Sequence, residues 1–253
     1  MAAFILMAKN WTGDMIVING KELSVAALIM ARGGSKRLPE KNIKIFAGKP
    51  LLAWTIQYCK ESQFIDRTIM STDCEAIADI SREYGAEVPF MRPDALAGDD
   101  AHVAKVFDHA LDFLLLSGEK PDLIVWMSPT NPLRDTHEID RFLRYFAAHQ
   151  SAKILISMVE VRDHPMHSDM LPPDLNMSAF SPFVDTNTQL LPKFYKSSEA
   201  LKMVDVDYYL QHRRFVTPNT FGYVHEEPYC VDIDSEHDFA YAESLLLNSH
   251  PEC

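Results

Sequence analysis

The sequence predicts an α/β protein with a doubly wound, mostly parallel sheet. Continuous apolar runs, typical of strands buried on both faces, occur at 24–30, 67–71, 122–127 and 152–161. Helical apolar patterns lie between or after them, at 50–61, 74–84, 101–116 and 135–148. This alternation indicates parallel strands joined by helical crossovers. Polar clusters follow three of the strands, and ligands of such sheets bind beyond the carboxyl ends of the strands.

Length and charge narrow the classes of function. The 253 residues suffice for one large domain, or for one domain that carries a smaller excursion. The formal net charge of −12 excludes a general affinity for nucleic acid or for an anionic membrane, so a phosphate site must be a local basic pocket. The cysteines match no zinc pattern, and we find no membrane-length apolar run and no signal peptide. We therefore expect a cytoplasmic protein with reduced thiols.

The chain divides into an extension, a main domain and an insertion. Residues 1–22 precede the first buried strand, and 15–20 within them predict a short strand and a tight turn. Residues 23–161 and 212–253 form the main α/β domain. Residues 162–211 interrupt the strand–helix rhythm and are rich in proline, so we expect an inserted segment there.

Capping residues mark the starts of helices. Asp135 with Glu138 predicts one helix start, and Ser235 with Asp238 predicts the start of the final helix. Asp73 follows the strand at 67–71, and we expect it to cap the next helix rather than to bind a metal ion.

The loop after the first buried strand has the composition of a phosphate-binding site. Gly33 and Gly34 allow the backbone to turn its N–H groups toward an anion. Four cations lie within ten residues: Arg32, Lys36, Arg37 and Lys41. A triphosphate requires both amides and cations. The run fits neither the Walker pattern nor the dinucleotide fingerprint, and a solvated basic loop is the alternative.

The same loop resembles the nucleotide-binding signature of the acylneuraminate cytidylyltransferases, also called CMP-sialic acid synthetases. The segments that carry the resemblance are Ala31–Asn42, Ser71–Asp73, Arg92-Pro93 with Leu96-Ala97 and Asp99, Ser128–Arg134 and Val231–Asp234. Together they extend over roughly residues 24–247. The resemblance implies a nucleotide-diphospho-sugar transferase-like fold.

The resemblance also implies roles for individual residues. The CTP phosphates would be held by Arg32, Lys36, Lys41 and Ser35. Of these, the three cations Arg32, Lys36 and Lys41 would also be catalytic. Ala31 and Gly33 would complete the loop around the nucleotide. Cytosine and ribose would contact Asn42, Arg92 and the backbone around Ala101. Asp232 and Asp234 would bind a divalent metal ion, Mg²⁺ or Mn²⁺.

The residues themselves support a metal site at this acidic pair. Asp232 and Asp234 are two positions apart, which on a strand places both carboxylates on one face. Their mutual repulsion favours a bound cation, and hard oxygen ligands beside a phosphate substrate favour Mg²⁺. The alternative is that Asp234 only begins the final helix while Asp232 faces solvent.

The sugar half departs from the family's pattern. Ser128 replaces a glutamine, Thr188 an arginine and His167 a lysine, and Ser198-Glu199 replaces an Asn-Gly pair. We still expect Ser128, Gln189 and His167 to bind the sugar. Further cations near an acidic substrate would come from His164, Lys193, Lys196 and Lys202.

These observations predict attack of a sugar hydroxyl on the α-phosphorus of CTP with release of pyrophosphate. The acceptor would be a sialic, pseudaminic or legionaminic acid-like sugar. Alternatives are a deoxy-sugar or phosphonate acceptor, or a nucleotide-binding regulator without catalysis. The resemblance also implies a homodimer formed through the insertion, with Phe180, Phe183, Phe194 and Tyr195 as candidate contacts.

Overall fold

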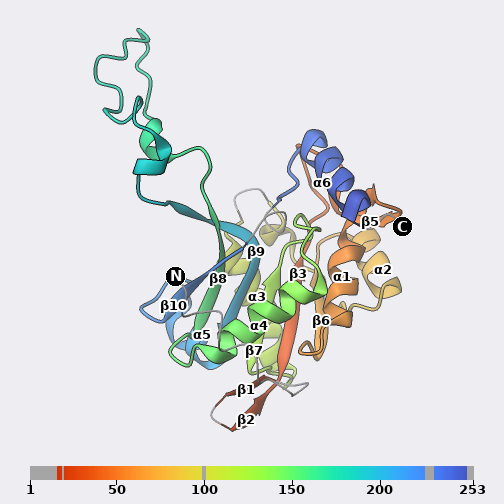
Figure 1. Ribbon diagram of the computed structural model, residues 1–253. Helices are drawn as coiled ribbons and strands as arrows, with labels where there is room; N and C mark the ends of the chain where they lie inside the picture. The colour runs from red at the N-terminus through yellow and green to blue at the C-terminus, as the bar shows by residue number, and fades with distance from the viewer. Residues whose placement is uncertain (1–15, 19, 99–100, 226–230, 250–253) are drawn as a thin grey trace.

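The computed structural model describes residues 16–18, 20–98, 101–225 and 231–249. A six-stranded sheet forms its centre, in the order β10-β8-β9-β7-β3-β6. The strands are β3 (Val25–Met30), β6 (Arg67–Ser71), β7 (Leu123–Met127), β8 (Ile154–Glu160), β9 (Tyr195–Asp205) and β10 (Thr220–Val224). All neighbours pair in parallel except β9, which is antiparallel to both β7 and β8. The predicted mostly parallel sheet is therefore confirmed (Figure 1).

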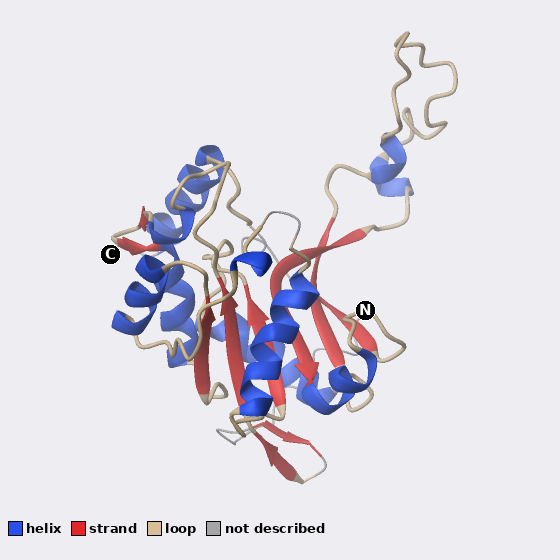
Figure 2. Cartoon of the chain, turned by 180° about the vertical axis from the view of Figure 1, so that it is seen from behind, coloured by secondary structure: helices blue, strands red, loops and turns tan. Residues whose placement is uncertain are grey.

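Helices cover both faces of this sheet (Figures 1 and 2). They are α1 (Leu51–Glu61), α2 (Glu75–Glu83), α3 (Val103–Leu116), α4 (Thr136–Ala148), α5 (Val206–His212) and α6 (Glu236–Ser249). Successive residues of β3 alternate between two buried cores: Ala27 and Ile29 pack with α1, α4 and α6, while Ala26 and Leu28 pack with α3 and α5. Two covered faces explain why the strands are continuously apolar. None of the helices in the described part of the chain is long and apolar enough to cross a lipid bilayer.

The end of the N-terminal extension forms a hairpin. β1 (Ile16–Ile18) pairs antiparallel with β2 (Lys21–Leu23), and Gly20 adopts φ +76 in the turn, a conformation that glycine tolerates without strain. Ile16 is fully buried, so the hairpin is anchored to the core. This confirms the predicted strand over 16–18, while residues 1–15 lie outside the described part.

The insertion leaves the sheet over a shorter range than the sequence predicts. Residues 161–194 project from the body as an arm with two 3₁₀ turns, Pro165–His167 and Thr188–Leu190 (Figure 1). The predicted segment 162–211 also contained β9 and α5, which belong to the main sheet domain. The polar start of β9 resembles a loop, whereas Ala200, Leu201 and Met203 are buried in the core.

Candidate active site

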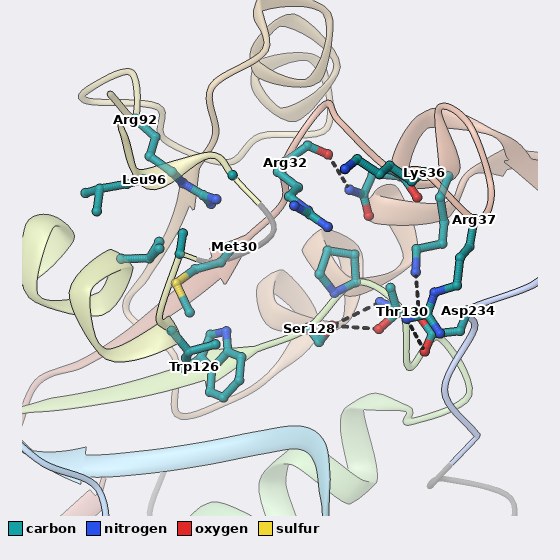
Figure 3. A pocket seen from close by; sticks show the side chains of 18 residues that line it. Met30, Arg32, Lys36, Arg37, Arg92, Leu96, Trp126, Ser128, Thr130 and Asp234 are labelled. Carbon is teal, nitrogen blue, oxygen red and sulfur yellow. Dashed lines mark hydrogen bonds and ion pairs between the residues drawn. The ribbon is translucent and has the colours of Figure 1, made fainter. Parts of the chain in front are cut away.

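A cavity of about 580 Å³ opens at the carboxyl ends of β3 and β7 (Figure 3). The structure brings most of the predicted site residues to its wall: Arg32, Ser35, Lys36, Lys41, Asn42, Arg92, Ala101, Ser128 and Asp234. This is the edge at which ligands of open α/β sheets bind. Segments more than 190 residues apart in the chain, such as Lys41 and Asp234, therefore meet around one space.

The glycine-containing loop follows β3 and is pinned to the end of β6. The Ala31 amide donates to the Ser71 carbonyl over 3.1 Å, and the Gly33 amide donates to the Asp73 carboxylate over 3.1 Å. A Cβ on Gly33 would lie 2.9 Å from the Cys74 Cβ, so the close approach requires glycine at this position. The Gly33 N–H is thus held by Asp73 and does not point toward an open anion site.

Asp73 therefore has a different role from the predicted helix cap. Cys74 occupies the capping position of α2 and makes no side-chain capping bond. The Asp73 carboxylate accepts the Gly33 amide instead, because the loop after β3 leaves that donor facing the end of β6. The other predicted caps are confirmed: Asp135 accepts the Glu138 amide over 2.8 Å, and Ser235 exchanges hydrogen bonds with Asp238.

The cationic loop and the acidic segment near the end of the chain are in direct contact. The Lys41 ammonium donates to the Ile233 carbonyl over 2.6 Å and to the Asp234 carboxylate over 3.2 Å. The Arg37 guanidinium lies 3.0 Å from the other Asp234 oxygen. Figure 3 shows Lys36, Arg37 and Asp234 along one side of the cavity. Positive and negative groups therefore meet at one side of the predicted triphosphate site.

Two further residues of the cavity wall, Asn42 and Arg92, have the features of a nucleoside pocket. Asn42 is buried and donates to the Arg32 carbonyl over 3.0 Å, while its side-chain oxygen has no hydrogen-bond partner among the described residues. Arg92 is buried against Ser71, and burial lowers the pKa of its guanidinium to about 10, so the group stays charged at neutral pH. Buried polar atoms are normally paired, so the unpaired Asn42 oxygen in the wall indicates a site for a ligand donor.

Ile233 orients the acidic pair. Its amide donates to the Thr130 carbonyl over 2.8 Å and its side chain is fully buried, so the neighbouring carboxylates turn away from the core. Residues 231–234 have no assigned strand, so the strand geometry that would place both carboxylates on one face is not present. The pKa of Asp232 is raised, chiefly because the surrounding chain displaces water from its carboxylate. The hydrogen bond from the Thr130 hydroxyl lowers this pKa, and the negative charge of Asp234 raises it further.

These two carboxylates suit a hard divalent ion. Mg²⁺ in phosphate-transfer sites takes only one or two protein carboxylates and completes its shell with water and substrate oxygens. Within the described residues no cluster of three or more potential metal ligands occurs, which excludes an all-protein cage there but is compatible with such a shared site. Of the two carboxylates, the half-exposed Asp234 lines the cavity, whereas Asp232 is not among its lining residues.

The loop after β7 is held by a buried arginine. Arg134 is fully buried and donates to the Ser128 carbonyl over 2.7 Å, to the Ala200 carbonyl over 3.0 Å and to the Thr55 hydroxyl over 3.0 Å. Its partners are neutral, so it forms no ion pair in these contacts. The Ser128 hydroxyl lies 2.7 Å from that of Thr130, beside the acidic segment. Arg134 thus connects β9 to the loop that carries Ser128.

Two predicted sugar-binding residues do not reach this cavity within one chain. His167 and Gln189 lie on the arm, where the His167 ring bonds the Thr186 carbonyl over 2.9 Å and the Gln189 amide bonds the Asn187 side chain over 3.0 Å. The structure separates them from Ser128 because β8 and β9 carry the arm outward (Figure 1).

Sequence reasoning missed part of the cavity wall. Met30 and Trp126 form its floor, and Trp126 has an indole N–H without a partner among the described residues. Both residues lie within apolar strand runs, so no signal distinguished them from ordinary core residues. Arg37 was recognised as one of the loop cations, but not as the partner of Asp234.

Fold and site together define an α/β protein with a cation-lined cavity at the carboxyl ends of its parallel strands. The family model described as cytidylyltransferase matches residues 26–248. The chain therefore belongs to the cytidylyltransferase family and is a nucleotidyltransferase.

Individual relatives share this family. Pseudaminic acid cytidylyltransferase of Campylobacter jejuni is 28% identical over 224 residues, which cover 88% of this chain and 96% of the relative. CMP-N,N'-diacetyllegionaminic acid synthase of Legionella pneumophila is 27% identical, with 88% and 97% covered. N-acylneuraminate cytidylyltransferase of Streptococcus agalactiae is 28% identical, with 87% of this chain and 52% of the relative covered. All three names describe transfer to acidic sugars of one class.

A solved structure supports the fold. CMP:2-keto-3-deoxy-manno-octonic acid synthetase complexed with CTP superposes with a TM-score of 0.65, covering 89% of this chain and 99% of the other. Because the identity is 12%, this likeness concerns the fold alone.

Proposed function

We propose that this protein transfers the cytidylyl group of CTP to an acidic nonulosonic sugar, a sialic, pseudaminic or legionaminic acid-like acceptor, and releases pyrophosphate. The observation that carries the proposal is the contact of Lys41 and Arg37 with Asp234 at the wall of the cavity. The names of the relatives support CTP as donor and this class of sugar as acceptor.

The reaction follows from the charges in the site. An oxygen of the acceptor's anomeric hydroxyl forms a bond to the α-phosphorus, and the bond from that phosphorus to the oxygen bridging to the β-phosphorus breaks. The hydroxyl proton passes to solvent, and pyrophosphate carries away the electron pair of the broken bond. Arg32, Lys36 and Lys41 would stabilise the negative charge that spreads over the phosphate oxygens.

The acidic pair would complete the site. Asp232 and Asp234 would hold Mg²⁺, or Mn²⁺ in its place, which when bound supplies positive charge to the phosphate oxygens. In this arrangement Asp234 would exchange part of its contact with Lys41 and Arg37 for the ion, and the two cations would turn to the phosphates. Asn42, Arg92 and the backbone at Ala101 would contact the nucleoside, and Ser35 the phosphates.

We further propose a cytoplasmic homodimer formed through the arm. The arm exposes large apolar side chains, among them Met170 at 90%, Leu175 at 68% and Leu190 at 78%. Apolar groups in such number are typical of a surface that a partner covers. A second copy would bring His167 and Gln189 toward an acceptor site that they do not reach in their own chain.

A pyrophosphate-release assay tests the proposed function. CTP, ATP, GTP and UTP are each combined with Mg²⁺ and with pseudaminic acid, N,N'-diacetyllegionaminic acid, N-acetylneuraminic acid, a deoxy-sugar acid or a phosphonate. We expect release only with CTP and one of the nonulosonic acids. Release with another acceptor alone would contradict the proposed acceptor, and CTP binding without release from any acceptor would indicate a regulator.

A further inference from the structure

An unusual backbone conformation occurs in β9 beside the cavity. Glu199 has φ +57, in the left-handed region that favours glycine and is costly for a residue with a long side chain. The pairing of β9 with β8 shifts in register between Lys202 and Ser197, so Glu199 lies in a β-bulge. In the resembling family a glycine stands at this step.

The surrounding chain holds the bulge in place. The Ser157 hydroxyl lies 2.6 Å from the Ser198 hydroxyl and accepts the Leu201 amide over 3.0 Å. On the other side, the buried Arg134 donates to the Ala200 carbonyl over 3.0 Å. Strained conformations persist where neighbouring contacts determine them in this way, and they concentrate at functional sites. The direction of the Glu199 side chain is therefore fixed by buried residues.

The carboxylate of Glu199 is oriented but remains accessible. Lys202 donates to one of its oxygens over 2.8 Å, and the Ser197 hydroxyl donates to the other over 3.3 Å. The Glu199 side chain is 46% exposed, whereas that of Lys202 is only 11% exposed. Because a carboxylate offers about four acceptor positions, this group retains capacity for donors of a ligand.

Neighbours of Glu199 in β9 connect it to two cavities. Lys202 contacts the ring of Trp126, in the wall of the first cavity, with its ammonium 4.2 Å from the ring centroid. Three residues before Glu199, Lys196 lines a second cavity of about 380 Å³, together with Val231. Val231 stands three residues before Asp234, which lines the first cavity.

We propose that Glu199 is a specificity-determining residue that accepts hydrogen bonds from a hydroxyl or N–H group of the acceptor sugar. Lys202 is a positioning residue that fixes the carboxylate. The inference rests on the proposed function and deepens it, because it assigns acceptor recognition to a side chain that replaces glycine. The strained backbone is retained because it directs this carboxylate to the acceptor.

Steady-state kinetics of the full-length protein test the inference, with CTP, Mg²⁺ and the nonulosonic acid that the wild type turns over fastest. Glu199→Gln keeps the shape of the side chain and removes its charge. We expect the acceptor KM to rise at least fivefold while the CTP KM stays within twofold. Glu199→Gly should raise the Tm, since it relaxes the backbone, and should raise the acceptor KM as well.

Glu87→Gln is the matched control. Glu87 is 45% exposed and pairs with Arg67 over 2.6 Å at the opposite end of the sheet, so both KM values should stay at the wild-type level. Lys202→Met should also raise the acceptor KM. Adding Glu199→Gln to it should raise this KM little further, because both changes remove the same contact.

Two outcomes separate this inference from the proposed function. If the wild type releases pyrophosphate and Glu199→Gln changes the acceptor KM by less than twofold, the role of Glu199 is overturned while the proposed function stands. Failure of the wild-type protein to release pyrophosphate with any nonulosonic acid would overturn both. An equal rise in the KM values for CTP and acceptor would also count against the inference, since it indicates a structural role.

Discussion

At the scale of single residues, the contact between Lys41 and Asp234 joins the cationic loop to the acidic segment near the end of the chain. The Lys41 ammonium is 11% exposed and bonds both the Ile233 carbonyl and the Asp234 carboxylate. In the proposed mechanism Asp234 would neutralise cations that bind the triphosphate, until a metal ion takes up its charge. The two ligands, metal and CTP, are therefore expected to favour one another's binding.

This coupling predicts that Asp234→Asn strengthens CTP binding without metal but impairs turnover with metal. In EDTA the variant should bind CTP about threefold to tenfold more tightly than the wild type, because one repulsive charge is removed and Lys41 is released. With saturating Mg²⁺, turnover should fall at least 100-fold, in line with the loss of a group that stabilises the transition state. Isothermal titration calorimetry and pyrophosphate release measure the two effects, and weaker CTP binding in EDTA would contradict the account.

Lys36→Ala tests the cationic loop. We expect at least a 100-fold loss of turnover, because the ammonium lines the predicted triphosphate site. The far-UV circular dichroism spectrum and the Tm should match those of the wild type, since the residue lies in a loop outside the core. Unchanged turnover would remove Lys36 from the proposed mechanism.

At the scale of the elements, the start of α6 is stabilised by a reciprocal cap. The Asp238 carboxylate accepts the Ser235 amide over 2.8 Å and the Ser235 hydroxyl over 2.7 Å. The hydrogen bond from Ser235 lowers the pKa of Asp238 below its ordinary value of 3.8. This cap also fixes the chain that leads from Asp234 into the helix.

Asp238→Ala should lower the free energy of unfolding by about 1 kcal/mol at pH 7. Because the folded-state pKa of Asp238 is depressed, its contribution is present above pH 3.8 and is lost as the pH falls through the folded-state value. Urea unfolding of both proteins at pH 7 and at decreasing pH measures this. A difference in stability that grows on acidification would contradict the assignment.

Arg134 connects α1, the loop after β7 and the bulge in β9. Its guanidinium is fully buried, and burial lowers its pKa to about 10. Arg134→Lys retains a charge but cannot bond Ser128, Ala200 and Thr55 together, so we expect a loss of about 2 to 3 kcal/mol in the free energy of unfolding. Chemical denaturation measures the loss, and a change below about 0.5 kcal/mol would contradict the proposed clamp.

The sequence predicts the regular elements well but not the position of β9. The runs that become β3, β6, β7 and β8 are apolar because both faces are covered, and the residues show this directly. In β9, Lys202 contacts the ring of Trp126, which is distant in the sequence, and pairs with Glu199, which no sequence pattern singles out. A strand whose polar residues are paired across the sheet lacks the apolar pattern that would reveal it.

The candidate site, too, could be predicted from the sequence only in part. The glycines and cations of the loop after β3 predict a phosphate site, because their chemistry is local. The bonds of Lys41 to Ile233 and Asp234 depend on how distant segments meet and required the structure. Asp73 was predicted as a cap because its neighbours in sequence suggest one, but its carboxylate accepts the Gly33 amide instead.

At the scale of the whole molecule, the arm separates residues that the sequence places in one site. His167 and Gln189 lie on the arm, away from Ser128 and the cavity (Figure 1). A dimer in which each arm reaches the partner would unite them. Such an arrangement would also cover the exposed apolar side chains of the arm.

Leu190→Asp tests this arrangement. The side chain is 78% exposed, so the change should leave the Tm of the isolated chain nearly unaffected, while a charge buried in an interface would oppose association. Light scattering should give twice 28.8 kDa for the wild type and 28.8 kDa for the variant. CTP binding should persist while acceptor turnover falls at least tenfold; a monomeric wild type with full activity would contradict the proposal.

The most direct test of the central claim is a crystal structure of the protein with CTP and Mn²⁺, in which anomalous scattering locates the ion. We predict an ion bonded to carboxylate oxygens of Asp232 and Asp234 and to a phosphate oxygen, with the triphosphate against Lys36 and Lys41. A triphosphate bound elsewhere, or an ion that touches neither aspartate, would contradict the account.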